Sequence, residues 1–187
     1  MIVSRHHHEI PIDHEMIVPL VSHHMSNATH KEIESILNYL FSLINSKEHN
    51  LFFESNLINE LIEELSTSPH QKKLNLTYFF VESFFLIHDY YVARYSDKIP
   101  EAKMNLMNKL LFHILEMSDN FEGHRCIVAL SFINQCFEHF QEICYELSQE
   151  IDFCDKLARL SSNDSESNQE ISDYAQTLLN KYFSVDD

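Results

Sequence analysis

Apolar residues recur along much of the chain three or four positions apart, which is the spacing of one face of an α-helix. Residues 33–44 follow this pattern almost without a gap, and residues 171–182 repeat it. Residues 57–65 and 127–137 carry shorter or weaker versions of the pattern. Side chains at this spacing lie on one side of a helix, so the pattern predicts amphipathic helices in each of these ranges.

Short polar stretches separate the apolar segments at residues 66–69, 118–120 and 161–165. Serine, aspartate and asparagine favour the position just before a helix, so each stretch predicts a helix boundary. Pro100 predicts the first position of a further helix. Residues 161–168 are polar enough to predict a mobile loop. No break is long enough for a domain linker, so residues 1–187 are expected to form a single domain, with residues 1–9 as a flexible N-terminal tail.

The segment TYFFVESFFLI, residues 77–87, is too apolar for an ordinary half-exposed helix and too polar for a membrane span. Leu76, Phe80 and Phe84 are predicted on its inner face, together with Ile87. Tyr78, Phe85 and Tyr90 are predicted nearer the opposite face. These aromatic residues are either core, covered by neighbouring helices, or a partner surface where they are left uncovered.

The composition narrows the fold class to all-α. The 187 residues contain a single glycine, Gly123, whereas tight β-hairpins and phosphate-binding loops depend on several. The chain contains four prolines, so long stretches can remain helical.

An internal repeat gives the helices an order. Four segments share one plan, in which an apolar helix is followed by a short polar loop and a longer apolar helix. The last apolar residues before the loops are Leu20, Leu65, Met117 and Leu160, at spacings of 45, 52 and 43 residues. Repeats of armadillo and HEAT type have periods of about 40–47 residues.

The residue pattern of these segments resembles that of armadillo-type repeats. MIVPLVSHHMS and LINELIEELSTS resemble the first helix and loop of that family's unit, and CIVALSFINQC resembles its second helix, with Asn134 near the family's asparagine. DYAQTLLNKYF is similar in its small Ala175 among leucines, while the family's usual glycine before the second helix is absent. The resemblance covers residues 10–183 and implies a right-handed α–α superhelix, an armadillo/HEAT-like solenoid of about four repeats; a plain helical bundle is the alternative.

Charge indicates the kind of partner. The formal net charge is −16 with histidines neutral, which repels nucleic acid. We expect a protein partner with a basic or apolar surface or an extended segment. Apolar residues at both ends of the repeat array predict docking into a larger assembly.

Cysteine usage and the absence of targeting signals predict the compartment. Cys126, Cys136, Cys144 and Cys154 form no CxxC pair and are expected to be free, mostly buried thiols. The sequence shows neither a signal-peptide pattern nor an apolar run long enough for a membrane span. These features predict a cytoplasmic protein, with the nucleus as an alternative.

No catalytic or cofactor chemistry is expected. The N-terminal RHHHEIPIDHE invites a zinc interpretation, but consecutive histidines cannot all reach one ion, and HExxH is absent. Cys136 and His139 lie three residues apart on one predicted helix, where a buried cysteine beside a surface histidine is the simpler interpretation.

The sequence therefore predicts a non-catalytic protein-binding scaffold or adaptor. In the resembling family a groove lined by second helices holds extended peptides, with asparagines clamping the peptide backbone, and Asn134 matches that position. Lys72 and Lys73 begin a predicted helix against its dipole preference, which suggests binding of an acidic group. The candidate contact residues are Asn38, Lys72, Lys73, Tyr78, Phe85, Asn134 and Gln135. The alternatives are a permanent structural subunit of a complex and a His-rich metal-binding protein.

Overall fold

The computed structural model describes residues 21, 24, 28–47, 49–96, 98–162 and 169–183. These residues form helices and contain no strand, which confirms the all-α prediction for this part of the chain. The elements are α2 (His30–Ile44), α3 (Asn50–Glu54), α4 (Leu57–Thr67), α5 (His70–Tyr95), α6 (Glu101–Met117), the 3-10 turn η1 (Ser118–Asn120), α7 (Gly123–His139), α8 (Gln141–Glu150), α9 (Phe153–Ser161) and α10 (Gln169–Tyr182).

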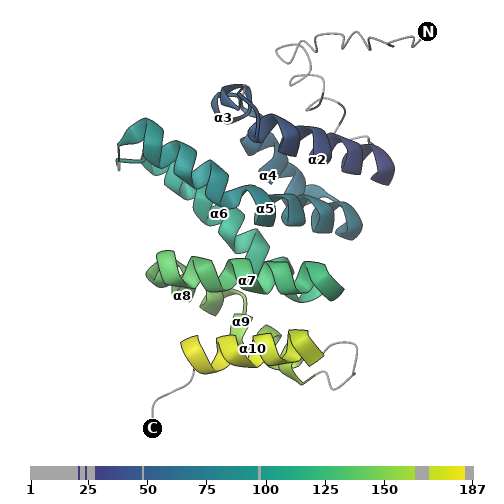
Figure 1. Ribbon diagram of the computed structural model, residues 1–187, viewed down its shortest axis with the longest axis vertical. Helices are drawn as coiled ribbons and strands as arrows, with labels where there is room; N and C mark the ends of the chain where they lie inside the picture. The colour runs from purple at the N-terminus through teal and green to yellow at the C-terminus, as the bar shows by residue number, and fades with distance from the viewer. Residues whose placement is uncertain are drawn as a thin grey trace, which may run out of the picture.

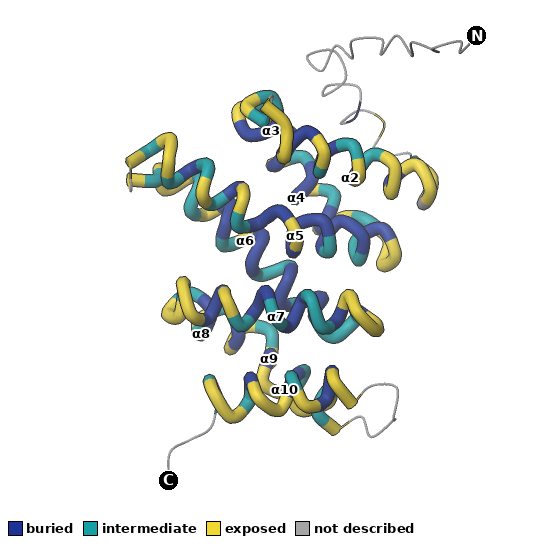
Figure 2. Tube along the Cα trace, in the orientation of Figure 1, coloured by how far each residue is buried: buried dark blue, intermediate teal, exposed yellow. Residues whose placement is uncertain are grey.

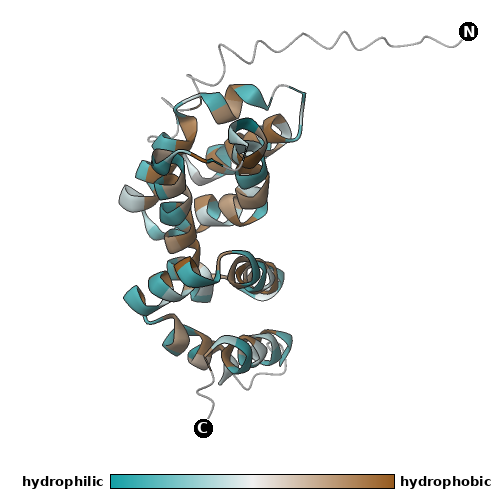
Figure 3. Cartoon of the chain, turned by 90° about the vertical axis from the view of Figure 1, so that its left-hand side faces the viewer, coloured by the Kyte–Doolittle hydropathy of each residue, from teal (hydrophilic) through white to brown (hydrophobic). Residues whose placement is uncertain are grey.

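The helices form two layers. In one layer α2 packs on α5, α5 on α7, and α7 on α10, so that α2 and α10 lie at opposite ends of the stack (Figure 1). In the other layer α4 packs on α6, α6 on α8, and α8 on α9. The side view in Figure 3 shows the helices arranged in two columns.

Three of the predicted helix–loop–helix segments correspond to consecutive helix pairs, namely α4 with α5, α6 with α7, and α9 with α10. Leu65, Met117 and Leu160 lie at or near the end of the first helix of each pair, as expected. Pro100 precedes α6 instead of occupying its first position. The short helices α3 and α8 were not predicted, and most of the first segment and the tail at residues 1–9 lie outside the described residues.

Helix α5 packs against four other helices, α2, α4, α6 and α7. Leu76, Phe80, Phe84 and Ile87 are at most 2% exposed, which confirms the predicted inner face. Its middle is largely dark blue in Figure 2. The buried hydroxyls of Thr77 and Ser83 donate to the carbonyls of Lys73 and Phe79, both at 2.8 Å, so these polar residues are satisfied within the helix.

The C-terminal end of the stack is polar. Ile171, Ala175 and Leu178 of α10 are buried, and the exposed positions of the helix are polar or charged: Gln169, Glu170, Asp173, Gln176, Thr177, Asn180 and Lys181. The prediction of an apolar end is therefore wrong here. Helix α10 is amphipathic: its apolar side chains are buried against the neighbouring helices, and its polar side chains face water. A polar outer face is the property of a terminal cap in a helical stack.

None of the helices in the described ranges is both long and apolar enough to cross a membrane, α5 included.

Candidate protein-binding groove

A groove of about 570 Å³ lies between α2, α5 and the start of α7. Two of the predicted contact residues, Asn38 and Tyr78, line it together. Its full lining is Glu34, Leu37, Asn38, Phe41, Asn75, Tyr78, Phe79, Glu82 and Arg125. The groove thus joins three helices that are far apart in the sequence.

Tyr78 and Arg125 form the wall of the groove between α5 and α7. The Arg125 guanidinium lies 4.8 Å from the centre of the Tyr78 ring, and its Nη1 donates to Asn75 Oδ1 at 3.3 Å. Phe121 packs against the same ring in a T-shaped arrangement, with the two ring centres 5.8 Å apart. Burial raises the pKa of Tyr78. The ring is therefore a half-buried anchor for Arg125, which ties the start of α7 to α5.

Glu82 lies one helical turn after Tyr78 on α5. Burial raises the pKa of its carboxyl, and the charge of Arg125 offsets only part of that effect. Within the described part of the chain the carboxylate has no hydrogen-bond or ion-pair partner. Glu82 is also exposed, so a cation from outside the chain can approach it.

Exposed residues continue along α5 beyond the groove. Tyr78, Glu82, Leu86 and Asp89 recur at helical spacing on one strip of that helix. Leu86 is 38% exposed and is the one large hydrophobic side chain exposed among the residues described. We call the solvent-accessible residues of α2, α5 and α7 the open face. It comprises Glu34, Asn38, Tyr78 and Glu82 of the groove together with Leu86 and Gln135, which are exposed but do not line the groove.

Phe85 does not lie free on this surface. Its ring packs edge-on against Phe132 at 5.4 Å and also contacts Phe140 and His139. Tyr90, likewise, stacks on Phe53 at 4.2 Å. Phe85 and Tyr90 are therefore covered by neighbouring helices, which is the first of the two predicted interpretations. Phe85 mainly joins α5 to α7.

Lys72 and Lys73 are paired within the chain. Lys72 is buried and its Nζ bonds Glu64 of α4, whereas Lys73 Nζ donates to Glu116 Oε2 of α6 at 2.8 Å. Burial would raise the pKa of Glu116, but hydrogen bonds from Lys73 and His113 outweigh it and lower that pKa. The misplaced charges at the start of α5 therefore have carboxylate partners on adjacent helices.

Asn134 joins α7 to α10. Its Oδ1 accepts hydrogen bonds from Lys181 Nζ at 3.0 Å and from the Tyr182 hydroxyl at 2.9 Å, and its Nδ2 donates to Glu138. A peptide clamp at Asn134 would have to displace these bonds. Its neighbour Gln135 is exposed on the open face.

Sequence reasoning missed Glu82, Leu86 and Arg125. Glu82 and Leu86 follow Tyr78 at intervals of four residues, so the spacing alone could have placed them beside it. No local pattern could have found Arg125, because only the packing of α7 against α5 brings it to Tyr78.

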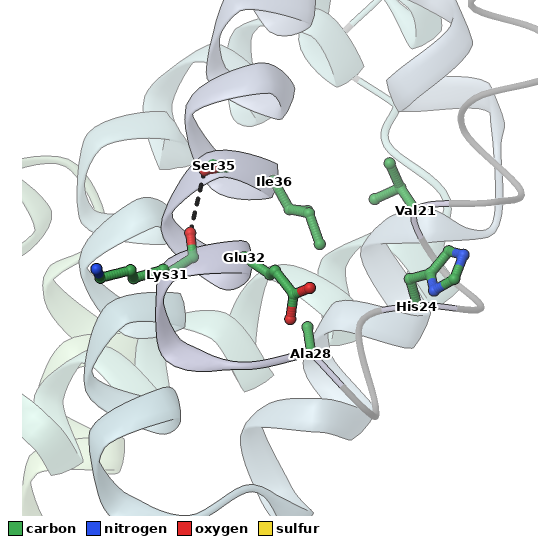
Figure 4. A pocket seen from close by; sticks show the side chains of 7 residues that line it. All are labelled: Val21, His24, Ala28, Lys31, Glu32, Ser35 and Ile36. Atoms are coloured by element: carbon green, nitrogen blue, oxygen red, sulfur yellow. Dashed lines mark hydrogen bonds between the residues drawn. The ribbon is translucent and has the colours of Figure 1, made fainter.

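A second pocket, of about 480 Å³, lies on the side of α2 at the end of the stack and is lined by Val21, His24, Ala28, Lys31, Glu32, Ser35 and Ile36 (Figure 4). The Glu32 carboxylate accepts hydrogen bonds from the Thr29 backbone N–H at 2.7 Å and hydroxyl at 2.6 Å. Ser35 Oγ donates to the Lys31 carbonyl at 3.1 Å. The Glu32 carboxylate of this pocket therefore caps the N-terminus of α2. Glu82 in the groove has no such hydrogen bond to another described residue.

The described residues contain no group of three or more His, Cys, Asp or Glu placed to hold a metal ion. The histidines at positions 6, 7, 8, 14 and 23 lie outside the described residues. Cys126, Cys136 and Cys144 are buried and free, and Cys154 is free and exposed, as predicted. Burial raises the pKa of Cys136, so this thiol is poorly suited to act as a nucleophile beside His139.

Comparisons of the chain with known protein families, curated proteins and solved structures give no match.

Proposed function

We propose that the protein is a non-catalytic scaffold that binds a partner protein on the open face. Its helix pairs would form a short, right-handed α–α solenoid of armadillo or HEAT type, in which the layer of α2, α5, α7 and α10 presents the binding surface. The succession of helix pairs, each packed on the next, supports this geometry.

The groove between α2, α5 and α7 is the observation that carries the proposal. On its three helices it combines the half-buried ring of Tyr78, the exposed amide of Asn38 and the carboxylate of Glu82, which has no hydrogen-bond or ion-pair partner among the described residues. Concave sites with a few placed polar groups are typical of binding surfaces. The next exposed feature on the same strip is Leu86, which gives a partner an apolar contact.

Permanent burial in a complex is the weaker alternative. Obligate interfaces are large and more apolar than the rest of a protein surface. Leu86 is the sole large hydrophobic residue exposed in the described part, and the end of the stack at α10 is polar. A reversible interaction on the open face fits this surface better.

The free, buried thiols support a reducing compartment, and we propose the cytoplasm or the nucleus.

Affinity capture with charge-matched variants tests this proposal. One variant carries Asn38→Arg and Gln135→Arg on the open face, and its control carries Asn59→Arg and Asn105→Arg on exposed positions of α4 and α6 in the other layer. Both variants gain the same charge at exposed helical sites, so both should fold.

We expect the wild type and the control to retain the same partner in stoichiometric amount from the native extract, and the open-face variant to lose it. Equal retention by both variants would place the interface elsewhere. Absence of any stoichiometric partner for the folded wild type would contradict the scaffold function itself.

A further inference from the structure

The charges around the groove define what it can accept. Glu34 and Glu82 line it, and Asp89 follows on the same strip of α5. Arg125 is the one cation of the lining, and it is already held by the Tyr78 ring and Asn75. The whole chain carries a formal net charge of −16. An acidic partner would meet repulsion here, whereas a basic one would be attracted.

Glu82 is the point at which this attraction becomes specific. Its side chain lines the groove, is exposed to solvent, and has no hydrogen-bond or ion-pair partner among the described residues. A lysine or arginine side chain that enters the groove can reach it and form a charge-assisted hydrogen bond.

Leu86 restricts the occupant further. It lies one turn beyond Glu82 and one turn before Asp89, so an apolar position stands between two carboxylates on one strip. A small cation or a polyamine has no apolar group to place there. A polypeptide that alternates basic and aliphatic side chains matches both features.

On the basis of the proposed scaffold function, we infer that the groove binds a basic segment of a partner protein, with a lysine or arginine on Glu82 and an adjacent aliphatic side chain on Leu86. The second basic side chain then faces Asp89. Arg125 keeps its place on Tyr78 and forms the wall of the site.

The test measures binding of a fluorescent Lys-Arg-Leu-Lys-Arg peptide to the full chain. The variant Glu82→Gln is compared with Glu146→Gln, which removes the same charge from an exposed position on α8 in the other layer. We expect Glu82→Gln to weaken binding by about tenfold and Glu146→Gln by less than about twofold, because only Glu82 contacts the peptide. Glu82→Gln should be at least as resistant to urea as the wild type, because the raised pKa means that the ionised carboxyl is disfavoured in the folded state.

Leu86→Ala and the peptide Lys-Arg-Ala-Lys-Arg test the apolar contact. Each change alone should weaken binding, and the two together should weaken it no more than one does, because both remove the same contact. The inference is overturned if the peptide does not bind, if both glutamine variants bind it equally, or if spermine displaces it at equal charge concentration.

The two proposals fail differently. If the captured partner binds the open face but its affinity is unchanged by Glu82→Gln, the scaffold function stands and the basic-segment inference is wrong.

Discussion

Tyr91 is buried together with its hydroxyl. The side chain is 1% exposed, its hydroxyl has no hydrogen-bond partner among the residues that the structure describes, and Lys103 Nζ lies 5.2 Å from the ring centre. Burial raises its pKa to about 12. A buried polar group without a partner loses its hydration and gains nothing in return.

Tyr91→Phe should therefore stabilise the protein or leave it unchanged, with a gain of up to about 1 kcal/mol in the free energy of unfolding. Urea denaturation measures this change. Tyr182→Phe is the control, because the Tyr182 hydroxyl donates to Asn134 Oδ1 at 2.9 Å, and its loss should cost about 1 kcal/mol. Equal destabilisation by both substitutions would mean that Tyr91 has a partner.

The cysteines should differ sharply in reactivity. Burial raises the pKa of Cys126 to about 11 and that of Cys144 to about 12, and it also raises the pKa of Cys136. The thiolate is the reactive form, so these thiols should be nearly inert at neutral pH. Exposed Cys154 should react alone with Ellman's reagent in the native protein, and all four cysteines should react in urea. Rapid native reaction of a second thiol would contradict the burial of these side chains.

At the scale of elements, ion pairs of Asp119 join η1 to α9. Asp119 accepts hydrogen bonds from Lys156 Nζ at 2.8 Å and Arg159 Nη2 at 3.0 Å, and Lys156 also donates to the Glu116 carbonyl. Burial alone would raise the pKa of Asp119, but these cations outweigh it and the pKa lies below its ordinary value.

The direction of this shift predicts an acid-sensitive contribution. A lowered pKa means that the folded state favours the ionised carboxyl, so the stabilisation is present above the unfolded pKa of about 3.9 and is lost as pH falls below it through the folded value. Asp119→Asn should lower the urea midpoint at neutral pH and reduce the further loss between about pH 4 and pH 2. An unchanged urea midpoint at neutral pH would show that the ion pairs of Asp119 add nothing to the free energy of unfolding.

The contact between α5 and α7 depends on Phe85. Its ring packs on Phe132 and Phe140, so Phe85→Ala should cost about 2 kcal/mol of unfolding free energy. Leu86→Ala, at the adjacent exposed position, should change it by less than about 0.5 kcal/mol. Thermal and urea denaturation of both variants check this difference, and a similar cost for both would contradict the assignment of Leu86 to the surface.

Much of this element structure could be predicted from the sequence, because helical periodicity depends on local spacing. The inner face of α5 and the boundaries at residues 66–69 and 118–120 follow from that spacing. The partners of Lys72, Lys73 and Asn134 could not be predicted, because they lie on other helices and depend on how the layers pack. For the same reason the groove was predicted only at Asn38 and Tyr78, which carry an exposed amide and an aromatic ring, whereas Arg125 reaches it through tertiary packing.

At the scale of the whole molecule, the groove and the exposed Leu86 lie on the same layer of helices. Glu82 lines the groove between α2, α5 and α7 of this layer. The exposed positions of α10, in the same layer, are polar or charged. On the proposed function, we expect a partner protein to bind the open face.

Site-specific photo-crosslinking in the native cell tests whether a partner binds there. A benzophenone side chain is placed at Asn38 or Glu82 on the open face, and at Asn59 or Asn105 on the other layer. We predict a covalent adduct with one partner protein from the open-face positions and none from the other layer. Adducts from Asn59 and Asn105 with none from Asn38 and Glu82 would contradict the account.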